Sequence, residues 1–131
     1  MRRTDWQARL SEFARERSAM PFEWGRNDCC LFTVDAVLAM TGVDHGARFR
    51  GYYTELGAGR LLKANGGVRG LATEAWGEPV PVAFAAVGDP VLMLNEGREL
   101  LAVCNGTCAI AAGPVGVVAL DMSAALAAWK I

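Results

Sequence analysis

The chain has 131 residues, of which 53% are hydrophobic and 21% are charged. A chain of this length forms one domain with its own core, and its apolar content argues against disorder. The formal net charge of −1 offers no excess of positive charge to neutralise phosphates, so nucleic-acid binding is not expected. The single histidine, His45, restricts the hydrolytic and metal sites that the chain can build.

No stretch of the sequence predicts a membrane span or a signal peptide. The longest nearly apolar stretch, 108–120, is interrupted by glycine and proline and is shorter than the roughly 20 residues of a spanning helix. The N-terminal residues are amphipathic rather than apolar, unlike a secretory signal. We therefore expect the chain to fold in a cytoplasm with its four cysteines as reduced thiols.

The N-terminal half shows helical periodicity. The pattern predicts four helices, over 5–19, 29–40, 54–65 and 68–76. The helix over 29–40 is apolar over most of its circumference, which is typical of a central buried helix. Asp28 is expected to cap its start and Gly42 to end it.

After Gly88-Asp89-Pro90 the pattern changes to short apolar runs separated by turn residues. These runs predict an antiparallel meander of about four strands, over 91–94, 99–104, 108–112 and 116–120. Residues 121–129 are expected to form a short closing helix. The whole pattern predicts one α+β domain spanning 1–131, with a helical half (1–78) packed on a sheet half (88–131).

The segment Trp24-Gly25-Arg26-Asn27-Asp28-Cys29-Cys30 is the sharpest local feature. A cysteine in the first turn of a buried helix lies at the positive end of the helix dipole, which favours the thiolate and hence a nucleophile. The alternative is that Cys29 and Cys30 are small core residues, because free cysteine is among the most buried residue types. The spacing alone leaves both interpretations open.

A cysteine nucleophile normally needs a histidine base, and His45 is the one candidate. It follows the helix that Cys29 begins, so it is expected near the opposite end of that helix. A metal or iron–sulfur site formed by the four cysteines is a further alternative. It requires that the Asn105-Gly106 hairpin bring two of them together on one face. The four cysteines are Cys29, Cys30, Cys104 and Cys108.

The run from Phe22 to Cys30 resembles the nucleophile motif of NlpC-type cell-wall cysteine peptidases, and Val87 to Val91 resembles the Gly-Asp turn that opens their sheet. The resemblance implies a papain-like arrangement with Cys29 at the nucleophile position. It also implies that the shared motif residues are structural, namely Trp24, Gly25, Asp28, Cys30, Gly88 and Asp89. The family's histidine has no counterpart within Leu100–Gly106, which predicts lost or altered chemistry.

A second resemblance covers nearly the whole chain. Pro21 to Cys30, Arg50 to Tyr53 and Ala128 to Ile131 are similar to segments of short proteins encoded among bacteriophage and prophage tail genes. This implies a structural or assembly protein of the tail tip or baseplate, without a cofactor. Its expected place is the virion, after assembly in the bacterial host cytoplasm.

The tail interpretation implies contacts with other tail-tip or hub proteins and with the host cell envelope. The exposed aromatic and terminal residues expected at such contacts are Tyr52, Tyr53, Trp129 and Ile131. The alternative function is an active peptidoglycan peptidase or amidase, in which Cys29 is the nucleophile and His45 or a partner chain supplies the base.

Overall fold

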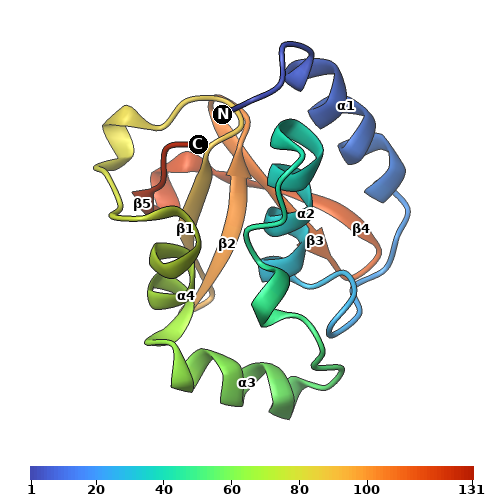
Figure 1. Ribbon diagram of the computed structural model, residues 1–131, viewed down its shortest axis with the longest axis vertical. Coiled ribbons are helices and arrows are strands. Elements are labelled where there is room, and N and C mark those ends of the chain that lie inside the picture. Colours follow the sequence, from blue (N-terminus) through green and yellow to red (C-terminus); the bar gives the residue numbers. More distant parts are fainter.

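The computed structural model describes residues 1–131, with four α-helices followed by a five-stranded antiparallel sheet (Figure 1). The helices are α1 (Trp6–Arg17), α2 (Cys29–Thr41), α3 (Glu55–Ala64) and α4 (Gly67–Trp76). The strands are β1 (Pro90–Asn95), β2 (Arg98–Cys104), β3 (Cys108–Gly113), β4 (Gly116–Asp121) and β5 (Ala125–Ala128), in the order β4-β3-β2-β1-β5. The predicted α+β class is confirmed. None of the helices combines the length and apolar character needed to cross a bilayer.

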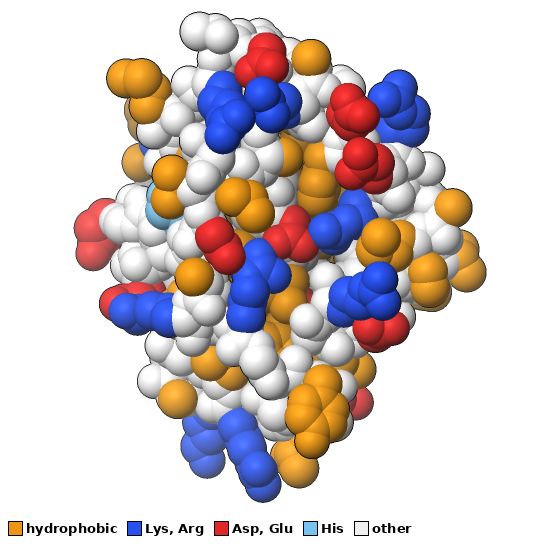
Figure 2. Space-filling view, turned by 45° about the vertical axis from the view of Figure 1, so that its right-hand side comes forward, with side chains coloured by type: hydrophobic (Ala, Val, Ile, Leu, Met, Phe, Trp, Pro, Cys, Tyr) orange, Lys and Arg blue, Asp and Glu red, His pale blue; other side chains and the backbone are white.

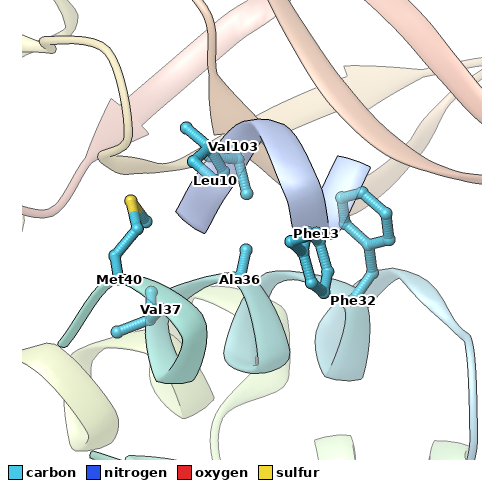
Figure 3. Close-up of a cluster of buried hydrophobic side chains, with 7 residues drawn as sticks. All are labelled: Leu10, Phe13, Phe32, Ala36, Val37, Met40 and Val103. Atoms are coloured by element: carbon cyan, nitrogen blue, oxygen red, sulfur yellow. The ribbon is translucent and has the colours of Figure 1, made fainter. Parts of the chain in front are cut away.

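Helix α2 is the central helix, as its apolar sequence predicts. Its first turn is capped by Asp28, whose side chain accepts a hydrogen bond from the Leu31 amide at 2.9 Å. Gly42 ends the helix in the left-handed conformation, with φ of 78°. Between these ends, Phe32 and Met40 are fully buried, and the Phe32 ring packs edge-on against Phe13 of α1, with 5.0 Å between the ring centroids (Figure 3).

The sheet is covered on both faces by different kinds of structure. One face packs against the helices, with Val103 beneath α1 and α2 and with Leu101 beside α4. The opposite face carries Ala102 and Cys104 and is covered by the segment between α4 and β1 and by the 3-10 turn η3 (Met122–Ala124). Alternate residues of β2 therefore belong to opposite layers of the core.

The four predicted strands are confirmed to within one residue at every end, while the predicted closing helix over 121–129 is wrong. That segment forms η3 and then β5, which pairs with β1. Its alanines favour a helix locally, but the free edge of β1 offers backbone partners that a separate helix would leave unused. On the other side of β5, Val80 and Ala128 exchange two backbone hydrogen bonds of 2.7 and 3.1 Å. The sheet thus has one strand more than expected.

The two ends of the chain lie close together (Figure 1), and side chains near both ends reach Asp89, in the turn that opens the sheet. The Asp89 carboxylate is fully buried and accepts hydrogen bonds from Arg2, at 2.7 Å, and from the Lys130 ammonium. Its Oδ2 also accepts from the Ala86 amide at 2.9 Å. Arg2 reaches the Ile131 carbonyl as well, at 3.3 Å. A buried carboxylate with this many donors is well compensated, and it ties both termini to the first strand.

Replacing the buried carboxylate should destabilise the fold. We expect Asp89→Asn to lower the free energy of unfolding by about 2–3 kcal/mol, because the neutral amide no longer pairs with the charges of Arg2 and Lys130 at a buried position. Urea denaturation followed by circular dichroism measures the change. The matched control is Asp5→Asn, which removes the solvent-exposed pair with Arg9 and should leave the urea midpoint unchanged. Equal midpoints for Asp89→Asn and the parent chain would contradict the role given to Asp89.

Candidate functional site

The loop that leads into α2 is built around two residues with fixed roles. Asn27 is buried, and its side-chain amide donates to the carbonyls of Met20 and Pro21 at 3.2 and 3.1 Å, which closes the loop on itself. Gly25 has φ of 80°, and a Cβ there would lie 2.0 Å from the Tyr52 carbonyl oxygen. Only glycine fits this close approach between two segments that are distant in sequence.

Asp28 does more than cap the helix, because its carboxylate joins three segments. One oxygen accepts from the Leu31 amide of α2, and the other accepts from the Gly25 amide at 2.9 Å and from the Tyr52 hydroxyl. Asp28 is 1% exposed. A buried carboxylate held by three donors is fully engaged, so we assign Asp28 a structural role rather than that of a proton acceptor.

Tyr52 is delivered to the site by the irregular segment between α2 and α3. Arg50, two residues earlier, pairs with Asp35 of α2 and with Asp44, which fixes the segment against the helix. Burial raises the pKa of the Tyr52 hydroxyl well above its ordinary value, and the hydrogen bond to the Asp28 carboxylate raises it further. Tyr52 therefore stays protonated and acts as a donor.

Cys29 and Cys30 begin α2 with their Sγ atoms 4.0 Å apart. The hydrogen bond with Cys30 lowers the pKa of the Cys29 thiol, and the backbone of Leu101 on β2 acts in the same direction, against the effect of burial. The same bond and burial raise the pKa of Cys30. Of the two, Cys29 has the lower thiol pKa, and it is also the more exposed.

Both cysteines line a mostly apolar cavity of about 80 Å³ between α2, α3, α4 and the start of β2. Trp24 and Tyr52 also line the cavity, and Arg98 and Glu99 of β2 supply polar side chains to its wall. The apolar lining residues are Leu31, Val34, Phe49, Ala58, Leu61, Leu62, Val68 and Leu71. No histidine contributes to this wall. The cavity therefore places the two thiols next to apolar side chains.

The remaining candidate ligands and bases lie elsewhere. His45 lines a separate hollow with Trp76 and Lys130, and its Nδ1 is buried without a hydrogen-bond partner. Cys104 pairs with Ala109 across the hairpin, so the hairpin does not place Cys104 opposite Cys108. Cys104 lies on the face of the sheet away from α2. No group of three or more His, Cys, Asp or Glu residues could hold a metal ion.

The residues expected at interfaces differ widely in how exposed they are. Tyr53 is 82% exposed, whereas Trp129 is fully buried among Cys30, Leu92 and Leu101, so its assignment to an interface is wrong. Ile131 is half-buried against the core near α1 and α2. Tyr52 belongs to the cysteine site instead. Sequence reasoning missed this role because the contact with Asp28 spans 24 positions.

One family model matches the chain over residues 1–131, and it is described as a domain of unknown function, DUF6950. No curated protein matches the chain.

Removing the hydroxyl of Tyr52 should destabilise the site. We expect Tyr52→Phe to lower the free energy of unfolding by about 1.5 kcal/mol at neutral pH, since a hydrogen bond to a charged group is lost. Because the pKa of Tyr52 is raised in the folded state, the contribution of its hydroxyl to the free energy of unfolding is complete below the unfolded pKa of about 10. This contribution is lost as the pH rises above that value. The difference between the variant and the parent chain should therefore shrink above this pH. Denaturation series at several pH values test this, with the exposed Tyr53→Phe as the matched control. A constant difference would count against the bond.

The pKa of Cys29 makes its alkylation rate a direct probe of the site. Because that pKa is lowered, the midpoint of the rate against pH should lie below the ordinary thiol value of about 8.5. In Cys30→Ala the hydrogen bond is absent and the midpoint should move up. Iodoacetamide labelling with mass spectrometry of the Cys29 peptide gives the profile. Cys104→Ala, on the far face of the sheet, should leave it unchanged. A midpoint at or above 8.5 in the parent chain would refute the assignment.

Proposed function

The chain belongs to the family described as domain of unknown function DUF6950, and we propose that it is a structural or assembly protein of a bacteriophage or prophage tail tip or baseplate. In this proposal it uses a papain-like, NlpC-type fold whose peptidase chemistry is degenerate. The tail assignment is supported by the resemblance of Pro21–Cys30, Arg50–Tyr53 and Ala128–Ile131 to proteins encoded among tail genes. The degenerate chemistry is supported by the cysteine site.

The proposal of degenerate peptidase chemistry rests on a nucleophile position that has no base. Cys29 begins a capped, buried helix beside β2, where a cysteine peptidase would need an imidazole. The positions of β2 on that side of the sheet are Glu99, Leu101 and Val103, and His45 lines a different hollow. General base catalysis contributes about 10²–10⁴ in rate, so a thiol in this setting is a poor hydrolase.

The surface supports a role in contacts rather than in nucleic-acid binding. Basic and acidic side chains are interspersed on the face shown in Figure 2, with apolar groups between them. Tyr53 and Leu56 are close in sequence at the start of α3, and they are 82% and 66% exposed. Such exposed apolar side chains are suited to neighbouring subunits of a tail tip or hub. The proposed location is the virion, where contact with the host envelope occurs.

A second candidate function is a cysteine hydrolase acting on peptidoglycan, with the base supplied by a partner chain. The lowered pKa of Cys29 and its position on the wall of the cavity favour it. In that case a partner's imidazole or carboxylate has to enter beside Trp24 or β2.

The two functions differ in what Cys29 contributes to infectivity. For a structural role, the protein should be present in purified particles, deletion of its gene should reduce the titre by orders of magnitude, and Cys29→Ala should leave the titre unchanged. Mass spectrometry of particles and plaque counts make these measurements, with Cys104→Ala as the control. A titre abolished by Cys29→Ala alone would favour the hydrolase. Absence from particles together with a normal titre after deletion would overturn the tail proposal.

A further inference from the structure

The pair of cysteines at the start of α2 has a geometry that a nucleophile alone does not need. Both residues line the same cavity, and their Sγ atoms lie 4.0 Å apart. Two thiols that face one cavity at this separation can be joined by oxidation, by a metal ion that takes four ligands, or by a soft ion that takes fewer.

A disulfide between the two is disfavoured by the helix. The S–S bond is about 2.05 Å long, and bridged residues usually have Cα atoms at least about 4.4 Å apart. The Cα atoms of adjacent residues are about 3.8 Å apart. Closing the bond would require the sulfurs to approach by half their separation and would disturb the first turn that Asp28 caps.

A zinc ion is disfavoured by the number of ligands. Structural zinc takes four protein ligands, whereas no third histidine, cysteine or carboxylate joins the pair. The nearest acidic residue along the chain, Asp28, has its oxygens engaged by Leu31, Gly25 and Tyr52.

We propose that Cys29 and Cys30 form a binding site for a soft monovalent metal ion of the Cu(I) class, held between the two sulfurs and reached through the apolar cavity. Thiolates select such ions, which accept low coordination numbers. With metal–sulfur bonds of about 2.3 Å, sulfurs 4.0 Å apart subtend an angle of about 120° at the ion. That angle is the one expected for trigonal coordination.

The surroundings favour this ion over a bare thiolate pair. Binding replaces the two thiol protons, which are released to solvent, and no electron is transferred. The complex of one Cu(I) with two thiolates carries a single negative charge at the N-terminus of α2, where the helix dipole is favourable. The apolar wall provided by Leu62, Val68 and Leu71 limits access of water.

The test is a titration of the full chain, reduced and kept anaerobic, with Cu(I) against a chromogenic Cu(I) chelator. We expect one Cu(I) per chain, with affinity weakened at least about a hundredfold in Cys29→Ser and in Cys30→Ser because half the donor set is lost. The control Cys104→Ser/Cys108→Ser should bind as the parent chain does. Zn(II) in the same assay should bind weakly. Equal Cu(I) binding by either single variant, or loss of binding in the control, would overturn the proposal.

A second measurement uses only the unmodified chain, so it stands even where Cys30→Ser fails to fold. Stoichiometric Cu(I) should protect Cys29 and Cys30 from N-ethylmaleimide, and peptide mass spectrometry should show Cys108 labelled to the same extent with and without the metal. X-ray absorption should show two sulfur ligands. Labelling of Cys29 that is unaffected by Cu(I) would overturn the proposal.

Discussion

The carboxylate of Asp28 is the interaction on which the site depends. It accepts from the first turn of α2, from the Gly25 turn and from the Tyr52 hydroxyl, so one buried charge positions a helix, a loop and a distant segment together. Burying a carboxylate is costly unless donors surround it. Because three donors do so, the position of Cys29 is set by the packing of the fold and does not require a catalytic partner.

Asp89 plays the corresponding part at the start of the sheet. Its carboxylate is held by Arg2 and Lys130, from the two ends of the chain. The two buried aspartates therefore have different structural roles. Asp28 connects segments of the helical half at the cysteine site, and Asp89 connects both termini to the start of β1. Each is a short-range sequence feature, a cap or a turn, that acquires long-range partners only in the folded chain.

This distinction explains how much of the structure could be predicted from the sequence. Asp28 and Gly42 mark the ends of α2 through local chemistry, and the central burial of this helix follows from its apolar circumference. Non-local pairing carries no such signal. The segment that contains Ala127 has helical propensity, yet it forms β5 because the edge of β1 is available, and this pairing also buries Trp129.

The candidate site shows the same limit. The cysteine at the start of a helix was recognisable, but the cavity beside it depends on where α3 and α4 return to the domain, and no residue pattern predicts that return. Leu61 and Leu62 of α3 line the cavity, whereas Leu56 of the same helix is 66% exposed. Helix α3 therefore uses only one edge of its apolar face to close the site.

The absence of a base and the presence of a second thiol both favour a shielded site over a catalytic one. A peptidase site has to expose its nucleophile to a substrate and to an imidazole, whereas Cys29 faces a small apolar cavity and its thiol contacts the Cys30 thiol and the backbone of Leu101. Under the proposed function, a fold that keeps the nucleophile position without a base does not have to admit a substrate. A small cavity then suffices to shield the thiol pair, and such shielding suits a buried ligand or a packed core better than turnover.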